Sequence, residues 1–305
     1  MRQKPAGRPS SSEHIIRWHD NPKIIYELIG GLQGEFRGHR LTINDQEFRG
    51  PRIPVEKPPN TYRIVGIGDS VIFGWGVADD EFYLVKLGDI LSESIPQVRI
   101  EWLNSAVPGY NTVSEVATLK EKLLVYEPDL VLVDYVQNDL YVPGFISRPR
   151  PYFTLDYSYL ARFIRHKLDG LHTLQRPPDA FRHEIFKEEL VPEQYRELIG
   201  IDAYREAMIE LKQLSETYGF NVLVLAHHGF DVEISEVLAN NGIETLDAKP
   251  LIHDFLNDKG FDQYAESPLV VSAKDSHPSA LLHRMLAEYL ALPIGHTIEK
   301  KSGER

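Results

Sequence analysis

The 305-residue sequence contains no cysteine, which excludes disulfides, thiolate catalysis and thiolate metal ligands together. It also contains no run of about 20 apolar residues that would span a bilayer. A formal net charge of −12, with no basic stripe, argues against nucleic acid and anionic membranes as partners. The remaining class is a globular protein, and 42% apolar residues in a chain of this length suffice for one large core or a core with a small appendage.

The N-terminus has charged residues but no apolar core, so it does not match a secretory signal peptide. We therefore expect a soluble protein that is cytoplasmic as the chain is written. The lack of cysteine suits cytoplasm and periplasm equally, so a periplasmic location stays open for a truncated chain.

The most informative segment is Arg63-Ile-Val-Gly-Ile-Gly-Asp-Ser-Val-Ile-Phe-Gly-Trp-Gly-Val77. Residues 62–67 form an apolar, β-branched run that predicts a buried strand, and the run ends in Gly68-Asp69-Ser70. A hydroxyl just past a buried strand is where open α/β proteins place their chemistry. The dinucleotide fingerprint G-x-G-x-x-G fails at Val71 and the nucleophile elbow G-x-S-x-G fails at Ile72, while a P-loop is absent.

Three further polar blocks follow in chain order. Leu103-Asn-Ser-Ala-Val-Pro-Gly-Tyr-Asn-Thr112 comes after a second predicted strand and contains Gly109. A third strand, 129–136, ends at Gln137-Asn138-Asp139, and Lys274-Asp-Ser-His-Pro-Ser279 opens the last helical pattern.

Together the four blocks resemble the signature blocks of the SGNH (GDSL) hydrolase family, over about residues 20–292. Ile43-Asn-Asp-Gln-Glu-Phe-Arg-Gly50 and Val107-Pro-Gly-Tyr-Asn-Thr112 are further similar to elements of a bacterial subgroup with a short N-terminal extension. The chain departs from the family pattern at Val71, at Gln137 and at Asp275, which lies two rather than three residues before His277.

Strands and helices alternate after residue 60, which predicts a parallel sheet covered on both faces. The predicted strands are 62–67, 98–103, 129–136, 221–227 and 242–246. The predicted helices are about 80–95, 111–125, 199–218, 231–240 and 278–291. Five such strands suit a flavodoxin-like three-layer α/β/α sandwich, which is also the fold that the resemblance implies.

The predicted organisation is an N-terminal arm or extension packing on the core (1–60), a hydrolase domain (61–295) and a disordered tail (296–305). The domain is interrupted by an insertion at about 141–195 that is rich in aromatic and arginine side chains. The insertion is either a satellite hydrophobic cluster under a long loop or a lid and substrate wall, because it leaves directly from the Asn138 block.

Ser70 is the predicted nucleophile, and His277 is the base that takes its proton. Asp275 would orient the imidazole and stabilise the imidazolium. The resemblance implies three oxyanion donors, namely the N–H groups of Ser70 and Gly109 and the side chain of Asn138.

Other polar residues near the blocks have simpler expected roles. We expect Asp69 to hold neighbouring loop amides, and Asp139 to cap or anchor its loop. His283 is expected to be a packed or surface histidine. His227 and His228 close the fourth strand at the carboxyl edge of the sheet, and one of them is a candidate substrate contact.

We therefore expect a serine esterase that hydrolyses O-acyl, including O-acetyl, esters through an acyl-enzyme, without a metal or cofactor. The D-x-H and G-H-x-H pattern of a two-metal phosphoesterase is incomplete here. Two alternatives stay open: an acyltransferase that uses the same residues on a glycan, and an inactive module that binds a glycan or a protein. The expected partner is a small-molecule or glycan ester; the acyl group, the alcohol and the oligomeric state are left undetermined.

Overall fold

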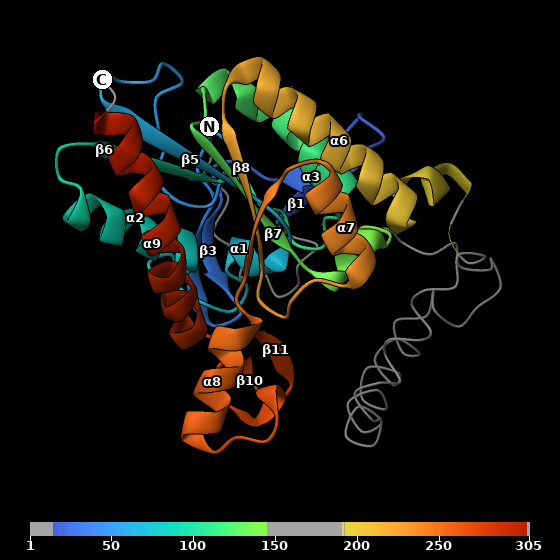
Figure 1. Ribbon diagram of the computed structural model, residues 1–305. Helices are drawn as coiled ribbons and strands as arrows, with labels where there is room; N and C mark the ends of the chain where they lie inside the picture. The colour runs from blue at the N-terminus through green and yellow to red at the C-terminus, as the bar shows by residue number, and fades with distance from the viewer. Residues whose placement is uncertain (1–14, 145–190, 192, 304–305) are drawn as a thin grey trace, which may run out of the picture.

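A five-stranded parallel sheet forms the centre of the computed structural model, which describes residues 15–144, 191 and 193–303 (Figure 1). The strands are β5 (Thr61–Ile67), β6 (Arg99–Asn104), β7 (Leu130–Tyr135), β8 (Asn221–Ala226) and β9 (Glu244–Asp247). Their order, β6-β5-β7-β8-β9, with every neighbouring pair parallel, is the flavodoxin-like order. The predicted sheet is confirmed.

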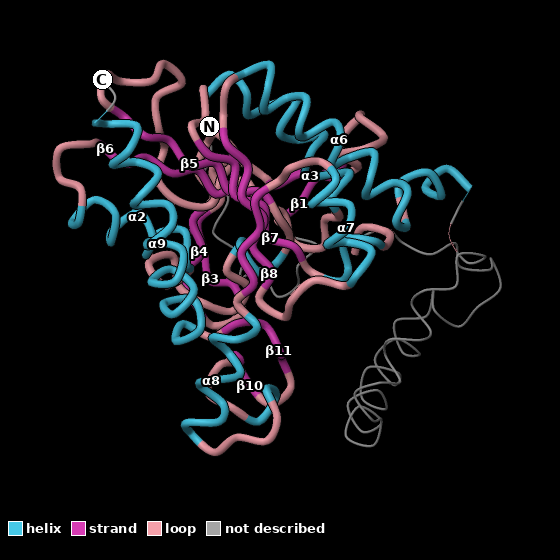
Figure 2. The backbone as a smooth tube through the Cα atoms, in the orientation of Figure 1, coloured by secondary structure: helices cyan, strands magenta, loops and turns pink. Residues whose placement is uncertain are grey.

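Helices cover both faces of this sheet, which gives the predicted three layers (Figure 2). One face carries α2 (Tyr83–Ser94) and α9 (Ala280–Gly303), and the other carries α3 (Thr112–Thr118), α6 (Gly200–Tyr218) and α7 (Val232–Asn240). A π-helical turn, Leu119–Leu123, and a 3₁₀ turn, Leu124–Tyr126, continue α3. Because both faces are covered, every residue of β5 and β7 is buried, and apolar residues predominate in both strands without alternating with exposed polar ones.

A small lobe between β9 and α9 did not follow from the sequence pattern. It consists of α8 (Lys249–Lys259), a 3₁₀ turn (Tyr264–Glu266) and the antiparallel strands β10 (Val270–Ser272) and β11 (Asp275–Pro278). Figure 1 shows the lobe at one end of the molecule, beside the end of α9 that follows β11. The last helix was expected to begin at about residue 278, and it begins at Ala280, directly after the block 274–279, most of which lies in β11.

The N-terminal extension folds into two hairpins. They are β1 (Ile16–Trp18) with β2 (Tyr26–Leu28), and β3 (Gln33–Phe36) with β4 (His39–Thr42). Their buried apolar side chains, such as Ile24 and Leu41, belong to the same hydrophobic cluster as the strands of the main sheet. Residues 1–14 lie outside the described residues.

Arg63 ties the proline-rich segment before β5 to the sheet. Its side chain is fully buried and donates from Nη2 to Glu101 Oε2 at 2.6 Å. It also donates to the carbonyl oxygens of Pro54 and Val55, each at 3.1 Å. A buried guanidinium is tolerated only with such complete partnering, so residues 54–55 are held against the core rather than left as a free linker.

The C-terminal segment differs from the expected disordered tail. Helix α9 continues to Gly303, with Pro293 inside it, and Lys301 Nζ pairs with Asp129 Oδ1 at 2.9 Å. Ile294 and Ile298 are buried in the core. Burial of these two side chains outweighs the local cost of a proline inside the helix.

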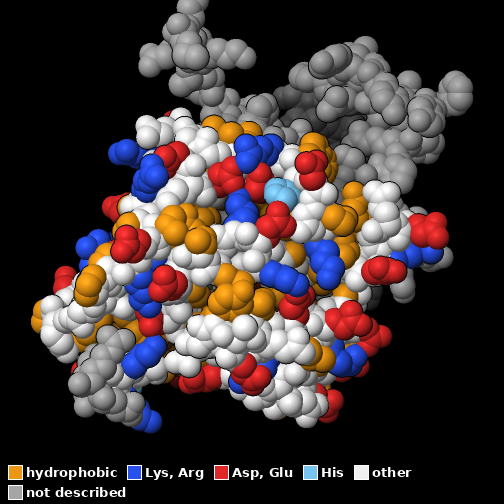
Figure 3. Space-filling model, turned by 90° about the horizontal axis from the view of Figure 1, so that it is seen from above, with side chains coloured by type: hydrophobic (Ala, Val, Ile, Leu, Met, Phe, Trp, Pro, Cys, Tyr) orange, Lys and Arg blue, Asp and Glu red, His pale blue; other side chains and the backbone are white. Residues whose placement is uncertain are grey.

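Acidic and basic side chains are interspersed on the face of the molecule shown in Figure 3. Among residues 15–144, 191 and 193–303, no helix has the length and apolarity needed to cross a membrane. Most of the insertion, including the aromatic and arginine side chains that suggested a lid, lies outside the described residues.

Candidate active site

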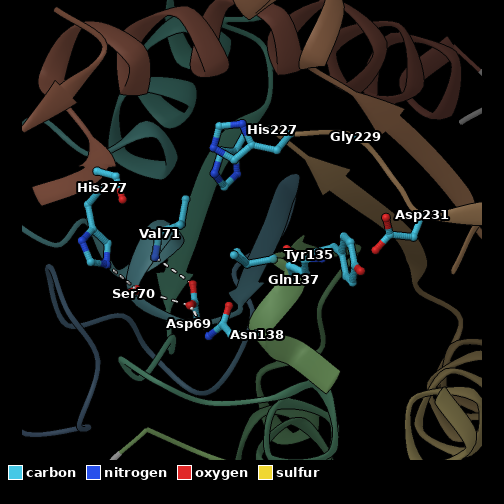
Figure 4. Close-up of a pocket in the computed structure, with 13 residues that line it drawn as sticks. Asp69, Ser70, Val71, Tyr135, Gln137, Asn138, His227, Gly229, Asp231 and His277 are labelled. Atoms are coloured by element: carbon cyan, nitrogen blue, oxygen red, sulfur yellow. Dashed lines mark hydrogen bonds between the residues drawn. The ribbon is translucent and has the colours of Figure 1, made fainter. Parts of the chain in front are cut away.

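A cavity of about 530 Å³ opens at the carboxyl edge of the central sheet (Figure 4). Ser70 follows β5, Asn138 follows β7 and His227 follows β8, so three neighbouring strands deliver polar side chains to it. The full lining comprises Asp69, Ser70, Val71, Tyr135, Val136, Gln137, Asn138, His227, His228, Gly229, Asp231, Ser276 and His277. β5 and β7 flank the point where the strand order reverses, which is where doubly wound sheets bind ligands.

Ser70 begins α1 (Ser70–Phe73), a single helical turn that packs directly on β5. The approach is close: a Cβ built at Gly66 would lie 2.7 Å from Ile72 Cδ1. Asp69 caps the turn by accepting the Val71 N–H at Oδ1, at 2.9 Å. The turn is thereby fixed with the Ser70 hydroxyl at its start, facing the cavity (Figure 4).

The structure brings Ser70, His277 and Asp275 into one hydrogen-bonded chain, although Ser70 and His277 are 207 residues apart. Ser70 Oγ lies 2.9 Å from His277 Nε2, and His277 Nδ1 lies 2.5 Å from Asp275 Oδ1. Oδ1 also accepts the backbone N–H of His277 at 3.2 Å. Two-residue spacing on β11 therefore suffices for a carboxylate to contact its imidazole.

Asp275 is ionised at neutral pH. The hydrogen bond from His277 is the largest cause that lowers the pKa of Asp275, to about 2, against the opposing effect of partial burial. A charged carboxylate at Nδ1 selects the tautomer that leaves Nε2 free to accept the Ser70 proton.

Asn138 lies on the 3₁₀ turn Gln137–Leu140 that follows β7, and its side chain contacts Asp69. Its Nδ2 donates to Asp69 Oδ2 at 2.9 Å, while Ser70 Oγ is 3.2 Å from the same oxygen. An amide NH₂ has two hydrogens, so one of them remains for a ligand in the cavity. Asp69 thus accepts hydrogen bonds from the Val71 amide, as expected, and from the Asn138 side chain.

Gly109 lies in the loop after β6, with a left-handed φ of 76°. The loop is joined to the serine turn, because the Val107 N–H donates to the Gly68 carbonyl at 3.2 Å. The Gly144 N–H in turn donates to the Gly109 carbonyl at 2.7 Å. Gly109 is not among the described residues that line the cavity, so its amide as an oxyanion donor stays a prediction.

His227 and His228 both line the cavity, with ring centroids 4.2 Å apart. His227 is buried, and its Nδ1 lies 3.9 Å from Asp134 Oδ1. The His228 ring packs edge-on against Tyr264 of the small lobe at 4.7 Å. Both side chains are thus placed where a bound ligand would meet them.

Buried carboxyl groups lie beneath this edge of the sheet. Burial is the largest cause that raises the pKa of Glu115 and of Asp139 well above the usual range, and nearby carboxylates add to it. Asp139 Oδ2 accepts the Val136 N–H at 3.1 Å, which anchors the turn carrying Asn138, as predicted. His283 is fully buried and accepts the Tyr83 N–H at 3.2 Å, so it is a packed histidine.

Trp75 is the contact residue that the sequence reasoning missed. Its indole stacks on the His277 ring with centroids 5.3 Å apart and planes at 25°. Its hydrogen-bond partner Asp275 is 200 residues away in the chain, so no local pattern predicts the contact. The only signal near Trp75 was its position between Gly74 and Gly76 in the serine block.

No cluster of three or more His, Cys, Asp or Glu side chains suited to a metal ion occurs in the part of the chain that the structure describes.

No protein-family model matches the sequence, and no curated protein matches it. Solved structures with similar folds include an acetylxylan esterase from Geobacillus stearothermophilus, at 14% identity and a TM-score of 0.46, covering 77% of this chain and 94% of that one. A lipase/acylhydrolase from Enterococcus faecalis has 15% identity and a TM-score of 0.43, covering 77% and 96%. Similarity of this degree does not assign an activity to this chain; the assignment depends on the side-chain geometry.

Proposed function

We propose that this chain is a serine esterase of the SGNH type that hydrolyses O-acyl esters through an acyl-enzyme. The observation that carries the proposal is the continuous chain Ser70 Oγ–His277 Nε2, His277 Nδ1–Asp275 Oδ1, at 2.9 and 2.5 Å, on the wall of a cavity. A nucleophile within reach of a base, with the base oriented by a third group, is the arrangement that activates a weak hydroxyl nucleophile.

In the proposed acylation step, Ser70 Oγ attacks the ester carbonyl carbon while its proton moves to His277 Nε2. Asp275 stabilises the imidazolium that forms. The carbonyl oxygen becomes an oxyanion, which the Ser70 amide, the free hydrogen of the Asn138 side chain and the Gly109 amide would receive. Collapse of the tetrahedral intermediate expels the alcohol, which takes the proton from His277. Water then repeats the sequence on the acyl-enzyme, with His277 again as base.

The lining of the cavity favours a short acyl group on a polar alcohol. Gln137, Asn138, His227, His228 and Asp231 present hydrogen-bonding groups, whereas a pocket for a long acyl chain would be largely apolar. We therefore propose O-acetyl esters of polyhydroxylated compounds as the substrate class, with His227 and His228 contacting the substrate.

Hydrolysis is favoured over acyl transfer because solvent reaches the reacting groups. The side chains of His277 and Asp275 are 30% and 23% exposed. Transfer to a glycan requires water to be kept from the acyl-enzyme. The insertion, for which a substrate wall was one of two expected roles, lies largely outside the described residues, so it supports neither reaction.

The proposal is tested by turnover of p-nitrophenyl acetate and p-nitrophenyl decanoate with the full chain, with and without EDTA. We expect the acetate to have the higher kcat/KM and EDTA to have no effect. Release of free acetate, rather than acetylated sugar, in the presence of glycan acceptors identifies hydrolysis. If acetylated sugar is the main product, the protein is an acyltransferase. Loss of turnover in EDTA that is restored by added metal would establish a metalloenzyme. If there is no turnover and Ser70 is unreactive, the binding module remains.

Replacing Asn138 by alanine should lower kcat by about 10²–10³-fold, equivalent to ~3–4 kcal/mol of transition-state stabilisation. KM should change little, because the second amide hydrogen meets a full negative charge only after attack. Steady-state kinetics on p-nitrophenyl acetate measure both constants.

Asn138→Asp is the matched control, because it keeps the size of the side chain but removes both donated hydrogens. It should be at least as slow as the alanine variant, and thermal unfolding should confirm that both variants are folded. A change confined to KM would make Asn138 a ground-state binding residue.

A further inference from the structure

Asp275 is held at both carboxylate oxygens by two different parts of the chain. Oδ1 meets His277 Nδ1 at 2.5 Å, and Oδ2 accepts the indole N–H of Trp75 at 3.2 Å. The same indole stacks on the His277 ring, with planes at 25°. One side chain therefore fixes the direction of the carboxylate and the plane of the imidazole together.

The Asp275–His277 pair needs such support because of where it lies. β10 and β11 form a two-stranded sheet of irregular register, separate from the five-stranded sheet that carries Ser70. Because an isolated two-stranded hairpin is at best marginally stable in water, β10 and β11 depend on contacts with the rest of the protein. The turn after Ser70 bridges the two sheets: besides the Trp75 contact, a Cβ at Gly76 would lie 2.9 Å from Val271 Cγ2.

The backbone on both sides of Trp75 is held by Arg49, a residue of the N-terminal extension. Its buried guanidinium donates to the carbonyl oxygens of Phe73 and Gly74, at 2.7 and 2.5 Å, and to that of Val77 at 2.7 Å. Phe73 is the last residue of α1, where carbonyl oxygens lack an intrahelical partner, so the arginine supplies one and holds the turn that follows.

The indole ring itself is packed by the β3–β4 hairpin. Phe36 meets it edge-on with centroids 4.9 Å apart, and the Arg37 guanidinium lies 4.6 Å from its centroid. Trp75 is 8% exposed and is not among the described residues lining the cavity, so it does not compete with substrate.

We propose that Trp75 is a positioning residue of the reaction, holding the Asp275–His277 pair in register with Ser70 through its N–H and its ring face. The proposal rests on the proposed esterase function. As His277 becomes an imidazolium, the aromatic face beside it favours the new positive charge, and the N–H keeps Oδ1 directed at Nδ1. The N-terminal extension, through Phe36, Arg37 and Arg49, holds Trp75 in place.

The test compares Trp75→Phe, which keeps a ring but loses the N–H, with Trp75→Leu, which loses both. For p-nitrophenyl acetate we expect kcat to fall by roughly tenfold in Trp75→Phe and by roughly a hundredfold in Trp75→Leu. The KM of both variants should stay within about twofold of the wild-type value. Trp102→Phe is the matched control: this partly buried tryptophan on β6 packs edge-on against Phe82, away from the cavity, and its replacement should leave kcat unchanged.

A double-mutant cycle separates positioning from general destabilisation. If Trp75 acts through Asp275, Trp75→Phe should cost little further activity in an Asp275→Ala background. A full kcat in Trp75→Phe, or an undiminished loss in the Asp275→Ala background, overturns the proposal.

A spectroscopic measurement keeps this proposal distinct from the esterase proposal. The sequence has three tryptophans, so the indole N–H signal of Trp75 in a ¹H–¹⁵N spectrum is assigned by its disappearance in Trp75→Phe. It should shift in Asp275→Ala and stay unchanged in Trp102→Phe. If the wild-type protein is inactive but the Trp75 signal shifts in Asp275→Ala, the esterase function is refuted and the Trp75–Asp275 contact is retained. If the signal does not shift in Asp275→Ala, the contact itself is refuted.

Discussion

Ser70→Ala is expected to reduce ester turnover by on the order of 10⁴-fold or more, because no other described hydroxyl lies within hydrogen-bond reach of His277 Nε2. Labelling by a fluorophosphonate should disappear with it, since that reagent needs the activated oxygen. The variant should remain folded, because the α1 turn is capped by Asp69 and not by the hydroxyl. Intact-mass labelling, p-nitrophenyl acetate kinetics and thermal unfolding measure the three quantities.

Ser276→Ala is the matched control for this experiment. Ser276 lines the same cavity and is exposed next to His277, so a reagent that merely favoured this cavity would reach it. The control variant should keep its labelling and its turnover. Label that maps to Ser276, or to any serine other than Ser70, would contradict the assignment of the nucleophile.

His277→Ala should cost about as much as Ser70→Ala, because the nucleophile and its base act as one unit. Asp275→Ala should leave roughly 10–100-fold more activity than His277→Ala, since the carboxylate orients and stabilises rather than transferring a proton. Parallel kinetics on the three variants, with thermal unfolding to establish folding, test this order. Full activity in Asp275→Ala would mean that another acceptor orients His277.

The pH dependence of ester turnover follows from the pair Asp275 and His277. The pKa of Asp275 is lowered to about 2, so this group stays charged throughout the range from about pH 5 to 8, in which imidazoles change charge. Asp275 therefore cannot account for a change in turnover over this range, and a rise in turnover with pH there reports the general base, which accepts a proton only when it is neutral. A flat profile over this range would contradict histidine as the general base.

Because the pKa of Asp275 is depressed in the folded state, its contribution to stability is present at neutral pH and lost only as the pH falls toward 2.

The central sheet and the edge that bears the site could be predicted because their signals are local. The mainly apolar runs at β5 and β7 predict strands covered on both faces, and alternation with helices predicts their parallel direction. Polar residues placed directly after those strands, Ser70 and Asn138, then necessarily meet at one edge.

The small lobe and the end of α9 could not be predicted in the same way. β10 and β11 are three and four residues long, too short to give a periodic signal, and β11 contains the polar residues Asp275 and His277. The last helix was expected to end at about residue 291, yet the burial of Ile298 keeps α9 intact beyond Pro293.

The sequence by itself determined the sheet, the order of its strands along the chain and the residue types offered for catalysis, since each depends on neighbours within a few positions. Only the tertiary structure decided that Asp275 contacts His277 across a two-residue spacing, that Asn138 is held by Asp69, and that Trp75 joins the serine turn to the histidine strand. Those contacts connect residues up to 200 positions apart in the chain. Their geometry depends on how the lobe and the N-terminal extension pack on the sheet, and no local pattern of side chains encodes that packing.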